Sequence, residues 1–305
     1  MLVSCPIDVY SRVQVTVSLP PGTNARLATL SGQPGQQDHG TPGLPKARRA
    51  VWLSLARLGI TDETVSLSIN VSSPIPHGKG MGSSTADIAA AVAATFAAFG
   101  KRASPHDIAA IALSIEPTDG TMFRGIALFD HRQGRVTRHL GKPPGVDLLI
   151  VDPGGEVDTL EFNRNPHLPE LNRKKEREVA EALCLVEQGV RNRDPRALGE
   201  GSTLSAKAHQ AILPKPGLDL VLTAAKDTGG AGINVAHSGT VMGMLFDSRT
   251  VDLPEVETYV RRKLPWAAIT SARLIGGGVK VVKTGEDHLS RREHTRCGAP
   301  VRAQA

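Results

Sequence analysis

Aromatic residues are scarce in this sequence. Phe, Trp and Tyr together make up 3% of its 305 residues, although 40% are hydrophobic and 22% are charged. These proportions are typical of a soluble globular protein, in which small aliphatic side chains must do most of the packing. The length suggests one large domain or two of ordinary size, enough to bury a substantial core.

Long hydrophobic runs and clustered cysteines are also lacking. The longest apolar run, residues 86–99, contains Asp87 and is too short to cross a bilayer. The opening MLVSCPIDVY shows no basic segment followed by an apolar run, so no signal peptide is expected. Cys5, Cys184 and Cys297 lie far apart and form no CxxC, which indicates a reduced, cytoplasmic protein without a membrane partner.

The net charge of +6 and the pI of about 9.4 would suit a nucleic-acid-binding protein. Much of the excess, however, lies in RRKL at 261–264 and in the tail KTGEDHLSRREHTRCGAPVRAQA. No aromatic residues are interleaved with the basic ones, and no nucleic-acid-reading motif is present. We therefore expect a solvated basic tail over 283–305 and no nucleic-acid partner.

The first half predicts strands, a loop and helices. Alternating valines in VQVTVSL favour a strand or hairpin arm within 1–19, and the Gly-, Pro-, Gln- and Ser-rich segment 20–46 predicts a mobile surface loop. Helical spacing over 47–58 ends at Gly59. An alternating strand follows from Thr64 to just before Pro74. The pattern then predicts helices from about Ser84 and over 104–115, and a strand over 124–130.

A second block starts near Gly145 and alternates strands with helices. VDLLIVDP reads as a buried strand, and 169–194 as one long amphipathic helix. Asp194 and Pro195 resemble the start of a helix that runs to Pro214. LDLVLTAAKDTG and VETYVRRKL are also predicted helices. GINVAHSGTVMGMLFD is predicted as a strand with a tight centre, and SARLIGGGVKVV as a strand pair or bend, giving a separate α+β unit.

The segment IPHGKGMGSSTAD, residues 75–87, places glycines at every second position directly before a helix. A helix N-terminus carries unpaired N–H groups and a partial positive charge, and glycines let that backbone approach an anion. Ser83 and Ser84 add hydroxyls there, and Lys79 can reach a phosphate as a point charge. Neither the Walker A frame nor the dinucleotide fingerprint fits this segment. The alternative is a flexible turn that only caps an alanine-rich helix.

PIPHGKGMGSSTAD resembles the central motif of the GHMP small-molecule kinases, Pro-x-x-x-Gly-Leu-Gly-Ser-Ser-Ala. VAHSGTVMGMLF and LIGGGVKVV are similar to two later motifs of that family, in the same order. The resemblance implies an α+β fold: a ribosomal-protein-S5-domain-2-like ATP-binding layer over 1–144, a ferredoxin-like layer over 145–282, and a disordered basic tail over 283–305. It assigns ATP binding to one continuous run: Pro76, His77, Gly78, Lys79, Gly80, Met81, Gly82, Ser83, Ser84 and Thr85.

LVSCPIDVYSRV, SIEPTDGTMF and TLSAKAHQAILPKPGL narrow the resemblance to a branch that phosphorylates the hydroxyl of L-threonine with ATP during adenosylcobalamin synthesis. Members of the branch open with a short strand and loop ahead of LVSCPID, so we expect either that the start codon is misplaced or that the first strand is missing here. Two alternatives stay open. The acceptor could be homoserine or another small alcohol, or the protein could bind nucleotide without catalysis.

The same resemblance assigns Ser84 and Glu116 to Mg²⁺, which prefers hard oxygen ligands. The alternative for Glu116 is a carboxylate at a helix end, paired with a basic neighbour. Asp119, three residues on, is the candidate base for the attacking hydroxyl, with Lys79 as the second catalytic residue. Alternatively, Asp119 caps the turn formed with Thr118 and Gly120.

Four residues are candidates for substrate binding: His209, Lys215, Ser238 and Gly277. A substrate carboxylate needs a cation or backbone donors, and His209 and Lys215 lie in HQAILPKPG, where similar sequences place basic residues. The alternatives are ordinary ones. The prolines beside Lys215 could simply stiffen a helix exit, the glycines around Gly277 could form a plain tight turn, and nearby His237 could be a satisfied buried histidine.

Overall fold

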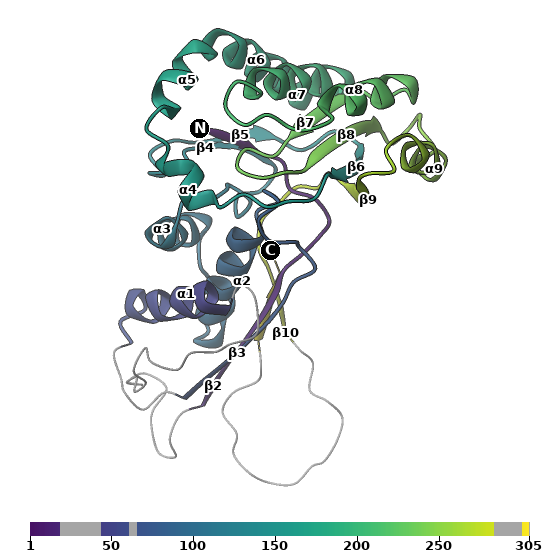
Figure 1. Cartoon of the computed structure of the whole chain (residues 1–305). Coiled ribbons are helices and arrows are strands. Elements are labelled where there is room, and N and C mark those ends of the chain that lie inside the picture. Colours follow the sequence, from purple (N-terminus) through teal and green to yellow (C-terminus); the bar gives the residue numbers. More distant parts are fainter. Residues whose placement is uncertain (19–43, 61–65, 284–300, 305) are drawn as a thin grey trace.

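The structure is a computed structural model that describes residues 1–18, 44–60, 66–283 and 301–304. Helices and sheets are stacked in two halves (Figure 1). At one end lie the helices α6 (Glu176–Asn192), α7 (Pro195–His209) and α8 (Leu218–Asp227), and at the other the long pair of strands β2 (Arg12–Ser18) and β3 (Ser66–Ser72). This mixture of helices with antiparallel sheets confirms the predicted α+β class. Among the described helices, none has both the length and the hydropathy needed to cross a membrane.

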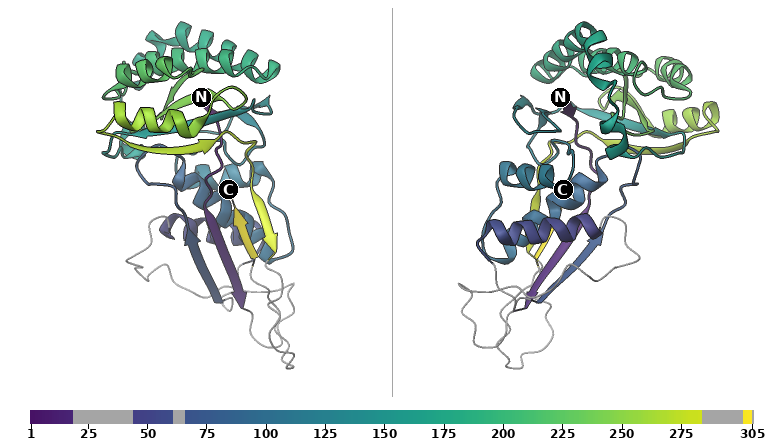
Figure 2. Two further views of the ribbon diagram at one scale, coloured as in Figure 1. Left: turned by 90° about the vertical axis from the view of Figure 1, so that its right-hand side faces the viewer. Right: turned by 60° about the vertical axis from the view of Figure 1, so that its left-hand side comes forward.

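An antiparallel four-stranded sheet supports the N-terminal half. Its order is β10-β11-β2-β3, with β2 at Arg12–Ser18, β3 at Ser66–Ser72, β10 at Lys280–Lys283 and β11 at Val301–Gln304. The helices α1 (Leu44–Arg57), α2 (Ser83–Ala98) and α3 (Pro105–Ile115) cover one face, as the two views of Figure 2 show. Alanines fill α2, so this almost fully buried helix can lie close to the inward-facing Val13 and Val15.

The C-terminal half is built on a second antiparallel sheet of order β7-β8-β6-β9. The strands are β6 (Val146–Asp152), β7 (Gly232–Val235), β8 (Met242–Asp247) and β9 (Ala268–Arg273). The accompanying helices are α6 (Glu176–Asn192), α7 (Pro195–His209), α8 (Leu218–Asp227) and α9 (Leu253–Lys263). In chain order this sheet reads 2-3-1-4, the ferredoxin-like arrangement that the resemblance implied.

A small third sheet joins the two halves. It consists of β1 (Leu2–Ser4), β4 (Ile126–Phe129) and β5 (Thr137–Gly141), in the order β1-β4-β5. Phe129 of β4 belongs to the core of the N-terminal half, whereas Ile126 packs with Val146 and Leu148 of β6. Two short helices, α4 (Thr159–Arg164) and α5 (Leu168–Lys174), complete the described elements.

Several predicted boundaries are wrong. The helix expected over 169–194 breaks at Lys175 into α5 and α6, although no glycine or proline marks the break. The strand expected over 232–247 is a hairpin, β7 and β8, and the helix expected to reach Pro214 ends at His209. For SARLIGGGVKVV, by contrast, one of the two predicted alternatives is correct: it is a bend between sheets, because β9 and β10 pair with different partners.

The loop and the tail also differ from expectation where the structure describes them. Helix α1 begins at Leu44, so the last residues of the predicted 20–46 loop are helical; the rest of that loop lies outside the described residues. Residues 301–304, predicted as disordered tail, form β11 between β10 and β2. With β10, they return the chain to the N-terminal sheet, beyond the boundary predicted at 145. Composition misses this pairing because backbone groups make it.

Candidate active site

The glycine loop lies between β3 and α2, and its backbone needs glycine. Gly78, Gly80 and Gly82 have φ values of 69°, 80° and 70°, in the left-handed region that L side chains rarely adopt. Helix α2 begins at Ser83, with Gly82 as its N-cap and no side chain capping it. The N–H groups of the first turn therefore remain available to an anion at this end of the helix.

Three loop side chains are already engaged within the protein. His77 Nδ1 lies 3.3 Å from the hydroxyl of Ser83, and Met81 packs against the cluster of Ile150 and Val241 in the C-terminal half. Pro76 is exposed at the start of the loop. The loop thus spans the junction between the two halves and is held on both sides.

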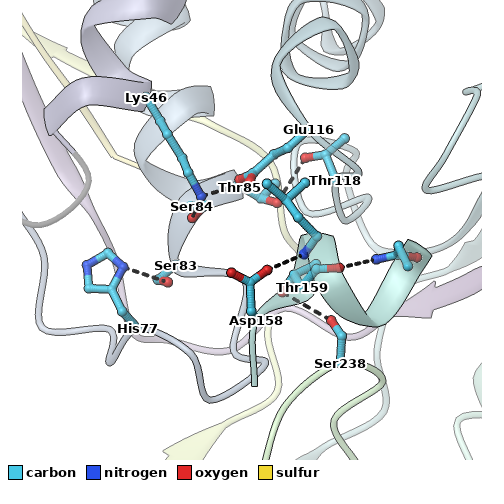
Figure 3. A network of polar contacts seen from close by, with 12 residues as sticks. Lys46, His77, Ser83, Ser84, Thr85, Glu116, Thr118, Asp158, Thr159 and Ser238 are labelled. Atoms are coloured by element: carbon cyan, nitrogen blue, oxygen red, sulfur yellow. Dashed lines mark hydrogen bonds and ion pairs between the residues drawn. The ribbon is translucent and has the colours of Figure 1, made fainter. Parts of the chain in front are cut away.

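Lys46 connects the two predicted metal ligands. Its Nζ lies 2.9 Å from Ser84 Oγ and 2.8 Å from Glu116 Oε2 (Figure 3). Glu116 follows α3 directly and its side chain is 6% exposed, whereas that of Lys46 is 41% exposed. The ion pair matches the alternative prediction for Glu116, a carboxylate with a basic neighbour. It also shows that one cation can bind both oxygens simultaneously.

The segment that carries Asp119 is fastened to α2. Thr85 Oγ1 lies 2.9 Å from Thr118 Oγ1 and accepts a hydrogen bond of 3.1 Å from the backbone N–H of Asp119. The hydroxyl of Thr85, predicted to bind ATP, is therefore buried and directed towards Thr118 (Figure 3) and the backbone of Asp119. A Cβ added to Gly82 would come within 2.8 Å of Asp119 Oδ2, so this carboxylate lies directly against the N-cap of α2.

Asp119 has the properties of a proton acceptor. Burial, reinforced by the nearby charge of Glu116, raises its pKa from 3.8 to about 6. Among the described residues, no side-chain hydrogen bond to its carboxylate oxygens contributes to this shift. A carboxylate with a pKa close to neutral can take a proton from an alcohol and release it again at cellular pH.

Lys79 does not point at the loop backbone. Its Nζ lies 3.0 Å from Asp152 Oδ2 and 2.7 Å from the carbonyl of Gly155. Its own carbonyl accepts hydrogen bonds from Thr240 and Val241. These contacts fasten the glycine loop to the 236–240 turn between β7 and β8. Reaching a phosphate would require Lys79 to leave the ion pair with Asp152.

The residues predicted to bind substrate fall into two places. Ser238 Oγ lies 3.3 Å from Thr159 Oγ1 at the start of α4, the residue that follows Asp158 (Figure 3). The buried Nζ of Lys215 donates to the carbonyl of Gly239, and His209 Nε2 lies 2.9 Å from the carbonyl of His237. These three predicted residues therefore surround the 236–240 turn.

Gly277 lies apart from that turn. An added Cβ there would meet the side chain of Pro6 at 2.5 Å and the carbonyl of Thr121 at 2.9 Å. It thus packs against the chain that follows Asp119, where only a glycine fits.

Sequence reasoning did not single out several polar side chains that lie near the predicted site residues. Lys46 was counted with the loop, and nothing in the spacing linked it to Ser84 or Glu116. Asp158, the N-cap of α4, accepts hydrogen bonds from two backbone N–H groups, of Leu160 and Glu161, which lower its pKa. In the sequence, the only local indication of this N-cap was the position of Asp158 directly before Thr159. His131 and Lys175, which contact His237 and His209, carried no signal in the sequence.

Comparison with known families identifies this arrangement. Residues 46–127 match the family model described as the GHMP kinases N-terminal domain, and residues 180–264 match the GHMP kinases C-terminal model. The chain belongs to the GHMP kinase family. It is accordingly an ATP-dependent small-molecule kinase, and the glycine loop, Ser84 and Glu116 all lie within the matched N-terminal region.

Two relatives of this GHMP kinase are similar over nearly its whole length. It is 34% identical over 284 residues to an L-threonine kinase of Salmonella typhimurium, covering 92% of this chain and 88% of that protein. It is 32% identical over 283 residues to an L-threonine kinase of Citrobacter freundii, covering 92% of each chain.

Solved structures bear out the fold of this GHMP kinase. Homoserine kinase from Cytophaga hutchinsonii superimposes with a TM-score of 0.63 at 16% identity, over 91% of this chain and 98% of that one. Mevalonate kinase from Methanococcus jannaschii superimposes with a TM-score of 0.61 at 18% identity, over 90% of this chain and 91% of that one. At these identities the likeness concerns the fold alone.

Proposed function

We propose that this GHMP kinase transfers the γ-phosphoryl group of ATP to the hydroxyl of L-threonine, giving O-phospho-L-threonine and ADP for cobalamin side-chain synthesis. The observation that carries the reaction type is the position of Asp119 against the N-cap of α2, beside Ser84 and Glu116. The choice of acceptor is supported by the similarity to two L-threonine kinases over 92% of the chain.

The roles follow from the contacts of each group. The glycine loop and the first turn of α2 would bind the phosphates through backbone N–H groups, which stabilise charge without rearranging. Asp119 would accept the hydroxyl proton as the threonine oxygen bonds to the γ-phosphorus and the bond to ADP breaks. Lys79 would add positive charge beside the phosphates if its Nζ left the ion pair with Asp152 and bound a phosphate instead. Positioning and charge neutralisation dominate such transfers.

The donor set near Lys46 also fits Mg²⁺. Ser84 Oγ and Glu116 Oε2 are hard oxygen donors, and both already lie within 3 Å of one cationic nitrogen. Among the described residues, no group of three or more His, Cys, Asp or Glu side chains could hold a metal, so phosphate oxygens and water would complete its coordination. When bound, the ion would neutralise charge on the phosphates.

Phosphoryl transfer with a panel of acceptors tests the proposal. The purified protein would be incubated with Mg·ATP and L-threonine, L-homoserine or L-serine, and products identified by mass spectrometry. We expect O-phospho-L-threonine, with kcat/KM for L-threonine at least tenfold above the other two. Preferred transfer to homoserine would reject the acceptor but keep the reaction type. ATP binding with no transfer to any acceptor would reject catalysis.

A further inference from the structure

Three histidines and a lysine meet beside the 236–240 turn. The ring centroids of His131 and His237 are 5.1 Å apart, those of His209 and His237 are 5.5 Å apart, and the ring of Phe162 lies 5.1 Å from that of His237. Lys175, at the break between α5 and α6, completes the group. We call His131, His209, His237 and Lys175 the histidine cluster.

The hydrogen bonds of His209 define its protonation. Its Nε2 lies 2.9 Å from a carbonyl, which can only accept, and its Nδ1 lies 3.3 Å from Lys175 Nζ, which can only donate. His209 is therefore a neutral imidazole with its proton on Nε2. Burial agrees, because it lowers the pKa of His209 and of His131 to about 4 and that of His237 to about 2.

Two polar groups of the histidine cluster lack the partner that their chemistry requires. In the described part of the chain, Lys175 Nζ contacts the neutral His209 and no carboxylate, and burial lowers its pKa. His131 is 8% exposed, and its Nδ1 has no hydrogen-bond partner among the described residues. The cluster thus offers one half-buried cationic donor, Lys175 Nζ, and one buried ring nitrogen without a partner, His131 Nδ1.

The cluster adjoins the proposed phosphoryl-transfer site through two links. The carbonyl of His131 accepts a hydrogen bond of 2.9 Å from the N–H of Thr118, the residue before Asp119. His237 begins the stretch that continues through Ser238 to Gly239, whose backbone rests on Lys79. The histidine cluster is therefore linked through the backbone both to the segment that carries Asp119 and to the glycine loop.

We propose that the histidine cluster binds the charged ends of an α-amino acid, with Lys175 pairing with the carboxylate and His131 Nδ1 accepting from the α-ammonium group. This rests on the proposed function and deepens it, because it assigns acceptor recognition to residues outside the glycine loop. A neutral imidazole suits an ammonium group, whereas a charged one would repel it. The site selects a zwitterion rather than any small alcohol.

Acceptor analogues that lack one charge test the assignment. L-Threoninol lacks the carboxylate, and 3-hydroxybutyrate lacks the ammonium group. We expect Lys175→Met to lower kcat/KM for L-threonine about 10- to 100-fold, mainly through KM, the range for a charge-assisted hydrogen bond. In the same variant, kcat/KM for L-threoninol should stay within about threefold of the wild-type value. His131→Phe should lower kcat/KM for L-threonine by a similar factor and leave kcat/KM for 3-hydroxybutyrate unchanged.

The matched control is Lys174→Met, which removes a neighbouring exposed lysine that pairs with Glu170 and should leave every value unchanged. Because Lys175→Met removes a desolvated charge, it should fold with at least wild-type thermal stability; Lys175→Gln serves as a second variant. If Lys175→Met lowers kcat/KM equally for L-threonine and L-threoninol, the assignment of Lys175 is wrong. If His131→Phe lowers kcat/KM equally for L-threonine and 3-hydroxybutyrate, the assignment of His131 is wrong. Failure of the wild type to phosphorylate L-threonine would instead reject the proposed function.

Discussion

At the scale of single residues, environment decides what each carboxylate can do. Glu116 and Asp119 are three residues apart, yet Glu116 pairs with Lys46 whereas Asp119 is desolvated beside the glycine loop. Burial and the charge of Glu116 raise the pKa of Asp119 to about 6. Under the proposed function, the two neighbouring carboxylates would have separate tasks, cation binding for Glu116 and proton transfer for Asp119.

Replacement of Asp119 tests its role as a base. We expect Asp119→Asn to lower kcat about 10²-fold or more, because the amide cannot accept the hydroxyl proton. Binding of Mg·ATP should remain within about threefold of the wild type, since the loop is unchanged. Steady-state kinetics and calorimetric nucleotide titration measure the two quantities. Wild-type turnover in this variant would exclude the base role.

The same variant should change how stability depends on pH. Because folding raises the pKa of Asp119 from 3.8 to about 6, the folded protein holds a proton between these values that the unfolded chain releases. Stability from this group is therefore lost as pH rises through 6. Asp119→Asn should unfold at higher urea concentration than the wild type at pH 8, and the difference should shrink towards pH 4.

Asp107 provides a control of opposite sign. The Ser104 hydroxyl, together with Arg57, lowers the pKa of Asp107, so this carboxylate stabilises the protein above its ordinary pKa. Asp107→Asn should therefore lower the urea midpoint at pH 8 and lose that effect in acid. If both variants shifted the urea midpoint at pH 8 in the same direction, the environments assigned to Asp119 and Asp107 would be wrong.

At the scale of elements, the glycine loop depends on the turn that it contacts. A Cβ on Gly80 would lie 2.5 Å from Ala236 Cβ and 2.9 Å from Gly239 Cα, and one on Gly239 would lie 2.1 Å from the carbonyl of Lys79. The β7–β8 turn therefore fixes the position of the loop that precedes α2. A strand prediction that left this turn inside one strand could not foresee that contact.

Gly80→Ala and Gly59→Ala separate backbone strain from this contact. Both glycines have positive φ, 80° and 73°, but an added Cβ at Gly59 meets nothing within 4 Å. Gly59→Ala should cost about 1–2 kcal/mol of stability and leave the KM for ATP unchanged. Gly80→Ala should cost more and raise that KM at least about tenfold, because the loop must shift. If the two variants raised the KM for ATP equally, the contact between the glycine loop and the β7–β8 turn would not control ATP binding.

At the scale of the whole molecule, the chain leaves the N-terminal half and returns to it. Strand β10 follows the C-terminal half, and β11 pairs with both β10 and β2 through four residues on each side. The N-terminal sheet therefore joins segments from both ends of the sequence. One of its four strands comes from residues that composition alone assigned to a solvated tail.

Removal of the chain after Lys283 tests that dependence. Truncation deletes β11 and leaves β10 without its partner strand. A loss of 1 kcal/mol lowers the Tm of a large domain by roughly 2–4 °C, and we expect the truncation to lower it by more than that. Residues from the glycine loop to Asp119 are retained, so kcat below the transition should change less than about threefold. Calorimetry measures the first quantity, and an unchanged Tm would show that β11 is dispensable.

The sequence by itself determined the glycine loop, the helix after it, the α+β class and the family. These depend on local chemistry: positive φ requires glycine, and three motifs occur in a fixed order. Only the tertiary structure brought Lys46 to Ser84 and Glu116, turned Lys79 to Asp152, gathered the histidine cluster and placed β11 in its sheet. Those contacts join residues far apart in the chain, so packing decides them and local spacing carries no record of it.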